Sequence, residues 1–364
     1  MSERAAGSAQ QAEQRVEELQ QLYPLPDAWA IRDTFLQHVR IGALDLYMIG
    51  LVAGRHDPTS AAGTVLESAL GSAAECAGYP VERAYFELLE RVCILIARRA
   101  TRPLIVRTVA GTELSQRTAL RVFPTHANGA EPQQRLSLSN GVAVHTQWQH
   151  ACATAQHELV ERDRVLRAWR GHAAVTYVAP HDEALARALS PHYRVHAVEF
   201  GAHTAGHTGL AHRVVGYFLF PQTAAAPLAY GFSAARDLPT ALAKAEREAL
   251  QRLAFLWGEP LPDVAPTPAP TPDFHQEHYL YPAHHARLHA WLEGGHRAES
   301  TMNMRVQKRH VTPSYDGELT IYVDLTPEAM RDRVAVVKAM SPHARQLRFG
   351  AARDPRVHPP HPIV

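Results

Sequence analysis

The stretch AQHELVER, residues 155–162, is the most informative part of this sequence because its pattern occurs three times. The pattern is Ala-x-x-Glu-x-x-(Glu or Gln)-Arg, and it returns as AYFELLER at 84–91 and as AEREALQR at 245–252. Residues three and seven positions apart share one face of a helix, so each copy predicts a helix with a small residue, a carboxylate and an arginine in line. Three such helices, if they converge, gather at least five carboxylates. Because carboxylates repel one another unless a cation lies among them, the pattern predicts a divalent cation that carries a nucleotide phosphate.

A single copy of the pattern has a plain alternative. A solvent-exposed helix face with one Glu–Arg pair four positions apart also fits it, and such a pair contributes only about a few tenths of a kcal/mol. Three copies with the same leading alanine favour a site, as does the Ser-Asn-Gly turn at 139–141 before the second copy. The backbone amides of that turn lie near a helix entrance, where anions bind favourably.

The bulk composition is that of an ordinary globular protein. The 364 residues suggest two domains of usual size or one large domain, and 46% hydrophobic residues allow a sizeable core. Lys and Arg total 37 against 36 for Asp and Glu. Charge therefore gives no reason to expect a nucleic acid or a membrane surface as a partner.

Targeting signals and cysteine content predict a cytoplasmic protein. Residues 1–22 are a predicted polar N-terminal tail with no apolar signal-peptide core, and no run of about 18 apolar residues occurs. Three cysteines are too few and too widely spaced for a disulfide framework, so we expect reduced thiols. The 23 histidines come without Cys, Asp or Glu at zinc-binding spacing, so no zinc site is predicted.

The order of predicted elements indicates the mixed α+β class. Helices are predicted over 28–53 and 61–100, over the second copy, from Asp237 through the third copy, and near 327–333. Strands are predicted at 103–108, 118–123, 173–179, 193–199, 213–220, 228–233, 319–325 and 334–339, with a further alternation around the Asn-Gly turn in 136–144. Residues 259–272 are proline-rich and form a predicted surface linker.

The usual nucleotide-binding motifs are absent from the sequence. The chain has no Gly-x-x-x-x-Gly-Lys-(Ser/Thr) loop and no Gly-x-Gly-x-x-Gly after a strand. It also lacks Gly-x-Ser-x-Gly, which weakens a serine-hydrolase interpretation. A nucleotide site therefore has to be built from carboxylates that bind Mg²⁺, a cation that prefers oxygen ligands and keeps some of its water.

The surroundings of the three copies resemble those of YcaO-type enzymes. SLSNGVAV at 137–144, followed by ELVERD at 158–163, resembles the central signature of that family. The helix at 84–91 resembles its earlier acidic helix. GFSAARDLPTAL at 231–242, which runs into 248–252, resembles its third helix.

The end of the chain resembles the azoline-forming branch of the same family. The residues that carry this likeness are 319–326, 334–340 and the terminal Pro-His-Pro. The resemblance spans roughly residues 60–364 and implies a YcaO-type α+β fold, with mixed sheets and helices that carry paired glutamates around an ATP site. It implies a catalytic domain over 23–364.

The resemblance also implies an activity. YcaO-type enzymes use ATP and Mg²⁺ to activate backbone amides of a peptide. A Cys, Ser or Thr side chain of the substrate attacks the preceding carbonyl, the resulting oxyanion takes the γ-phosphate, and loss of phosphate leaves a thiazoline or oxazoline ring. Phosphoryl transfer needs positioning and charge neutralisation more than covalent help, so Mg²⁺-binding carboxylates and arginines are the expected equipment.

Four glutamates match the paired acidic residues of the family. Glu87 and Glu90 match the first pair, and Glu158 and Glu161 match the second. The resemblance implies that these four bind both ATP and Mg²⁺.

Other residues match the family's site less directly. Glu248 and Gln251 match the third helix and are implied ATP-binding residues, although Gln251 offers a metal only a neutral oxygen and fits a packing role equally. Arg162 either contacts phosphate or pairs with Glu158. Asn140 and its neighbour Ser139 either line the nucleotide pocket or are simple turn residues.

The C-terminal tail, 353–364, departs from the family pattern. The azoline-forming branch ends in Pro-x-Pro-x-Pro with the tail in the active site, but this chain ends in Pro360-His-Pro-Ile-Val364. Prolines hold such a tail extended at low entropic cost. The resemblance implies a catalytic base in the Val364 carboxylate; a disordered proline-rich end is the alternative.

The expected partners are a precursor peptide and a second protein. No part of the sequence resembles a module that grasps a leader peptide, so we expect a separate protein to deliver the precursor. A homodimer stays open. Thioamide or amidine formation by the same ATP chemistry and a noncatalytic peptide-binding scaffold are the competing functions.

Overall fold

The computed structural model describes residues 3–26, 28–57, 65–124, 134–201, 211–294, 315–350 and 359–363. The chain divides into two units. The first comprises Met1–Phe123, Gly141–Gln156 and Thr320–Met340, and the second comprises Pro124–Asn140, His157–Leu319 and Ser341–Val364. The residues expected to form one catalytic domain are therefore shared between two units.

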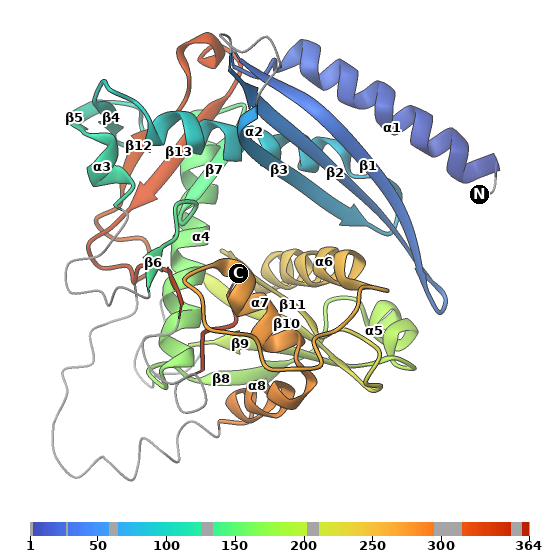
Figure 1. Cartoon of the computed structure of the whole chain (residues 1–364). Helices are drawn as coiled ribbons and strands as arrows, with labels where there is room; N and C mark the ends of the chain where they lie inside the picture. Colours follow the sequence, from blue (N-terminus) through green and yellow to red (C-terminus); the bar gives the residue numbers. More distant parts are fainter. Residues whose placement is uncertain are drawn as a thin grey trace, which may run out of the picture. The chain divides into compact units, whose positions relative to one another are not determined.

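A meander of three antiparallel strands and the helix after it begin the first unit (Figure 1). In chain order the elements are α1 (Glu3–Leu22), β1 (Trp29–Ile41), β2 (Leu44–His56), β3 (Val65–Glu75) and α2 (Val81–Arg98). The β1–β2 hairpin turns at Gly42, whose φ of 60° lies in the left-handed region that glycine adopts at low cost. Helix α2 packs on β3 and β2, and apolar side chains of α1, β2, β3 and α2 form one core cluster.

The predicted helix over 28–53 is wrong, and the predicted helix over 61–100 is right only from Val81 onward among its described residues. Residues 46–53 are almost entirely apolar because β2 is the central strand of its sheet and is largely buried. Such a run fits a buried strand and a buried helix equally. In β3, Ala73 favours a helix by propensity, but it lies on the strand face of Gly71 and belongs to the core cluster that α2 completes.

Residues 3–22 of the predicted polar tail form helix α1. Its inner face buries Ala12, Val16 and Leu19, which recur at helical spacing. Arg15 on the same helix pairs with Glu82 of α2. The segment is therefore part of the first unit and contributes to its core.

A five-stranded antiparallel sheet completes the first unit. Its order is β5 (Glu113–Arg117), β4 (Leu104–Arg107), β12 (Ile321–Asp324), β13 (Ala335–Met340) and β7 (Val142–His145). The strands predicted around residues 105, 322 and 337 are confirmed. The strand predicted over 118–123 is wrong, because Ala119–Val122 form the short helix α3. The helix expected near 327–333 is a single 3₁₀ turn, Glu328–Met330.

Helix α4 (Trp148–Trp169) carries the second copy of the pattern and contributes residues to both units. In the second unit follow β8 (Val175–Val178), α5 (Glu183–Leu189), β9 (Tyr193–Phe200), β10 (Arg213–Pro221), β11 (Ala229–Ala235) and α6 (Leu238–Leu256). The strands form an antiparallel sheet in the order β11-β10-β9-β8. Helix α6 begins after Asp237, whose carboxylate accepts the backbone N–H of Thr240 at 2.8 Å, and packs on β11 and β10. These elements confirm the predictions for 173–252.

The rest of the second unit consists of short elements. They are α7 (Pro272–Leu280), a 3₁₀ turn (Pro282–His284), α8 (His285–Leu292), and the strand pair β6 (Arg135–Leu136) and β14 (Arg348–Phe349). The predicted linker 259–272 is mostly exposed or half-buried chain between α6 and α7. In the part of the chain that the structure describes, no helix is long and apolar enough to cross a membrane.

Candidate nucleotide and metal site

The first copy of the pattern packs its helix α2 tightly against strand β3. A Cβ placed on Gly71 of β3 would lie 2.2 Å from the Ala84 carbonyl oxygen and 2.3 Å from the Leu88 nitrogen. No side chain fits there, so the close approach requires glycine on the strand and a small residue on the helix. Glu87 then accepts the backbone N–H of Ser72 at 3.0 Å. The alanine and the first glutamate of this copy anchor the helix to the strand.

The third copy repeats this geometry in the second unit. A Cβ on Gly231 of β11 would lie 2.4 Å from the Ala245 carbonyl oxygen and 2.5 Å from the Ala249 nitrogen of α6. Glu248 accepts the backbone N–H of Phe232, the residue after the glycine, at 2.8 Å. The leading alanine of the second copy, Ala155, is also fully buried. The alanine shared by the three copies is therefore a packing residue.

The second copy places two carboxylates around one arginine on α4. Arg162 lies 3.4 Å from Glu158 and 3.4 Å from Glu161. Glu161 is only 8% exposed. Burial raises the pKa of Glu161 to about 8; the nearby negative charges of Glu248 and Glu158 act in the same direction, and Arg162 opposes them. We call Glu158, Glu161 and Glu248 the acidic cluster.

The donor chemistry of the acidic cluster fits a hard divalent cation. Three carboxylates lie near one another, and the negative charges of Glu248 and Glu158 add to the burial that raises the pKa of Glu161. Within the described ranges, no three His, Cys, Asp or Glu side chains are arranged to hold a metal by themselves. Mg²⁺ suits this arrangement because it takes one or two protein carboxylates and fills its remaining positions with phosphate oxygens and water.

The sequence matches a family model described as YcaO cyclodehydratase, ATP- and Mg²⁺-binding, over residues 71–345. The chain belongs to the YcaO family. The match covers all three copies of the pattern and includes parts of both units. No curated protein matches the chain in sequence.

Two solved structures share the YcaO fold with this chain. The YcaO protein from Methanopyrus kandleri, bound with AMPPCP and Mg²⁺, is 16% identical with a TM-score of 0.51, and the match covers 92% of this chain and 90% of that one. A heterocyclase in complex with substrate and cofactor is 15% identical with a TM-score of 0.56 over 92% of this chain. The match covers 52% of the heterocyclase, so the present chain spans about half of its length. At these identities the likeness establishes the predicted α+β YcaO fold.

The structure places the predicted site residues of this YcaO protein in separate groups. Glu87 and Glu90 are half-buried on α2 of the first unit, and the acidic cluster belongs to the second. The convergence of the two groups stays a prediction. Gln251 is half-buried on α6. Two further predicted residues, Ser139 and Asn140, lie in the turn before Gly141, whose φ is 72°. Val364 lies outside the described residues.

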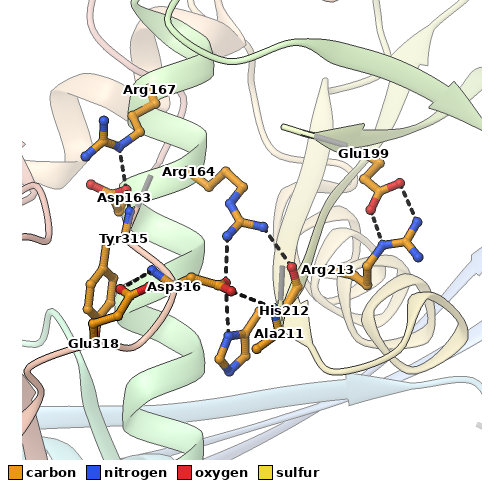
Figure 2. Close-up of polar contacts among 10 residues, drawn as sticks. All are labelled: Asp163, Arg164, Arg167, Glu199, Ala211, His212, Arg213, Tyr315, Asp316 and Glu318. Carbon is orange, nitrogen blue, oxygen red and sulfur yellow. Dashed lines mark hydrogen bonds and ion pairs between the residues drawn. The ribbon is translucent and has the colours of Figure 1, made fainter. Parts of the chain in front are cut away.

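A buried polar network directly after the second copy was not anticipated from the sequence (Figure 2). Asp163 is fully buried and accepts three hydrogen bonds. They come from Arg167 Nε at 2.6 Å, the backbone N–H of Tyr315 at 3.1 Å and the backbone N–H of Arg345 at 2.9 Å. One carboxylate thus ties α4 to two distant segments of the second unit.

The next residue of α4, Arg164, extends this network toward β10. Its guanidinium is 1% exposed, donates to the His212 carbonyl oxygen at 2.7 Å and pairs with Asp316 at 2.8 Å (Figure 2). Asp316 also accepts from the backbone N–H of Ala211 at 2.5 Å. These contacts fix the part of α4 directly after Glu161 and Arg162. The one sequence signal for them is a run of charged residues, 161–164, in mid-helix, where solvent exposure is the usual expectation.

Proposed function

We propose that this YcaO protein uses Mg-ATP to activate backbone amides of a ribosomally synthesised precursor peptide, forming thiazoline or oxazoline rings. The observation that carries the proposal is the acidic cluster of Glu158, Glu161 and Glu248 around Arg162, within a chain of the YcaO family. Activation of the same backbone amides could instead give a thioamide or an amidine, which is the alternative function.

The ring-forming reaction balances without a redox step. The thiol or hydroxyl of a substrate Cys, Ser or Thr bonds to the preceding carbonyl carbon and gives up its proton. The carbonyl oxygen takes the γ-phosphoryl group, so that ATP becomes ADP. That oxygen leaves as phosphate while the amide nitrogen loses its proton and forms the C=N bond. The peptide loses the elements of one water for each ring.

The chain's own residues supply charge and position for this reaction. In this proposal Glu87, Glu90, Glu158 and Glu161 would bind Mg²⁺, one or two of them directly and the others through its bound water, and Glu248 would lie in the nucleotide pocket. The cation would offset phosphate charge and orient the transferred group. Arg162 offsets further negative charge as the phosphoryl group moves. The proposal also assigns Asn140 and Gln251 to the nucleotide pocket.

The partners remain part of the proposal. The heterocyclase with the same fold was solved with a substrate and a cofactor, which supports a peptide-modifying role for this chain as well. We expect a separate protein to bind the leader of the precursor peptide and present it.

Mass spectrometry tests this function. The protein is incubated with Mg-ATP, candidate precursor peptides that contain Cys, Ser and Thr, and a candidate protein that binds their leader segments. ATP-dependent loss of one water per modified Cys, Ser or Thr supports ring formation. Replacement of oxygen by sulfur indicates the thioamide alternative, and no mass change with any peptide contradicts both.

Two variants separate the site from the scaffold. Glu161→Gln is expected to abolish the mass change and to weaken Mg-ATP binding measured by calorimetry. Glu259→Gln, a change at an exposed residue of the same unit, is the matched control and should leave both unchanged. A noncatalytic scaffold shows no Mg-ATP binding in any of these proteins.

A further inference from the structure

The last described residues of the chain are seated against helix α7. The Tyr279 hydroxyl donates to the Pro360 carbonyl oxygen. His275 Nδ1, one turn earlier on the helix, lies 2.9 Å from the His361 carbonyl oxygen. Ile363 is 1% exposed. The tail at 359–363 is thus a packed element of the second unit.

The hydrogen bonds of His275 determine which of its ring nitrogens carries the proton. The backbone N–H of Gly350 donates to His275 Nε2 at 2.9 Å, so Nε2 presents a lone pair. The His361 carbonyl oxygen can only accept, so Nδ1 carries the hydrogen and donates it. A side chain with no exposed surface is therefore held neutral in one tautomer by a backbone group at each nitrogen.

A second imidazole makes the reciprocal contact. His361 Nε2 lies 2.6 Å from the Arg348 carbonyl oxygen and donates to it. Arg348 belongs to β14, and Gly350 follows that strand directly. The two rings lie 4.3 Å apart between their centroids. His275 thus links the end of β14 to the tail, and His361 links the tail back to β14.

The seat is joined to the second copy of the pattern through β14. Asp163, next to Arg162, accepts the backbone N–H of Arg345 at 2.9 Å, and Arg345 lies three residues before that strand. His361 has a pKa well below its usual value, first because of burial and then because of positive neighbours that include Arg162. Arg162 is the arginine of the acidic cluster. The contact from Asp163 to Arg345 and the contacts from the end of β14 to His275 and His361 therefore connect residues 360–363 to α4, the helix that carries Glu158, Glu161 and Arg162.

We propose that His275 is a positioning residue that holds the C-terminal tail beside the acidic cluster, and that ring formation depends on this contact. The catalytic part of this inference rests on the proposed function, whereas the contact between His275 and the tail does not depend on it. Prolines at 359, 360 and 362 stiffen the tail, so one anchored carbonyl restricts the residues on both sides of it.

Two substitutions of His275 each remove one of its two hydrogen bonds and keep the other. In His275→Asn the side-chain amide nitrogen takes the place of Nδ1 and keeps a donor for the His361 carbonyl, while the acceptor for Gly350 is lost. In His275→Gln the amide oxygen takes the place of Nε2 and keeps the acceptor for Gly350, while the donor for the tail is lost. A purely structural role predicts similar effects of both.

Carboxypeptidase digestion followed by intact-mass measurement shows how firmly the tail is held, and it does not depend on activity. Release of the buried Ile363 requires the tail to leave its seat. We expect His275→Gln to speed this release about tenfold, as for the loss of one buried hydrogen bond, and His275→Asn to stay near the wild-type rate. Tyr279→Phe, which removes the bond to Pro360 without changing shape, should also speed it. Equal rates in the Gln and Asn variants, or no change in any variant, overturn the proposal.

Activity then tests the catalytic consequence. His275→Gln is expected to lower kcat for ring formation about tenfold with little change in the KM for Mg-ATP, and His275→Asn to retain most of the activity. In a chain that ends at Pro360, His275→Gln should have no further effect, because the two changes remove the same contact. Additive losses overturn the proposal. A wild-type protein that forms no rings refutes the proposed function but leaves the digestion result intact.

Discussion

The first and third copies of the pattern sit on nearly the same scaffold but in different electrostatic surroundings. In both, a helix packs on the last strand of an antiparallel meander, α2 on β3 and α6 on β11. In both, a glycine of that strand meets the helix backbone, and the first glutamate accepts the N–H of the following residue. The repeated part of the sequence pattern therefore encodes a way of docking a helix.

The two copies differ in what their arginines do. Arg91, 52% exposed, pairs with Glu87 at 2.7 Å. Arg252 lies over the ring of the buried Tyr230, 4.0 Å from its centroid. The charge of Glu248 instead contributes to the raised pKa of Glu161. The same docking thus leaves one carboxylate in a surface ion pair and brings the other to an acidic cluster, so a shared pattern does not imply a shared role.

The largest expected effect tests the shared docking itself. Gly71→Ala and Gly231→Ala each drive a Cβ into helix backbone that cannot move aside. Each should lower the free energy of unfolding by about 2 to 3 kcal/mol in urea titrations. Gly258→Ala is the control, because its Cβ meets open space and only a positive φ of 86° opposes it, at about 1 kcal/mol. If Gly231→Ala lowers the free energy of unfolding and Gly71→Ala does not, then α2 and α6 do not dock on their strands in the same way.

The next effect concerns which glutamates hold Mg-ATP. Glu161→Gln should weaken Mg-ATP binding in calorimetry by at least about tenfold, because it removes a carboxylate from the site while keeping the shape of the side chain. Glu87→Gln should weaken binding similarly if α2 also serves the site. Unchanged affinity in Glu87→Gln assigns the first copy to packing alone and sharpens the contrast with the third.

Acid should affect the second unit more than the first. Among the described histidines, the buried ones, His212, His275 and His278, all belong to the second unit. Burial lowers the pKa of His275 to about 4 and that of His278 to about 3, from 6.5. Because the folded pKa of His275 is depressed, its contribution to stability is complete above pH 6.5 and is lost as the pH falls toward 4.

Thermal unfolding at two pH values measures this loss. Between pH 7 and pH 4 the titration of His275 should cost about 1 to 3 kcal/mol. His278 on the same helix and His361 of the tail, whose pKa values are also lowered, act in the same direction. His275→Gln cannot titrate at this position and should lose less stability over the same range. Equal losses in both proteins contradict the assignment.

The smallest effect compares the two arginines. Arg252→Met removes a cation stacked on an aromatic ring and should lower the free energy of unfolding by about 1 kcal/mol. Arg91→Met removes an exposed ion pair and should change it by less than about 0.5 kcal/mol. Chemical denaturation of both variants measures the difference, and a reversed order contradicts the contrast drawn between the copies.

Local signals in the sequence predicted much of the second unit. The strands around β9, β10 and β11 are rich in aromatic and β-branched residues, and Asp237 with a proline in the first turn marks the start of α6. The resemblance carried by the three copies identified the family that the family model then established. These features depend on short stretches of chain, which is why they could be predicted.

What the sequence by itself determined is the family, the α+β class and the carboxylates from which a cation site can be built. Only the tertiary structure decided that β2 is a buried central strand and that the leading alanines of the first and third copies pack against a strand. It also decided that Asp163 and His275 bind backbone groups far away in the chain. The physical reason is the same in each case. Periodicity and caps act within a few residues, whereas burial on both faces, close backbone approach and the partner of a buried polar atom depend on segments that only folding brings together.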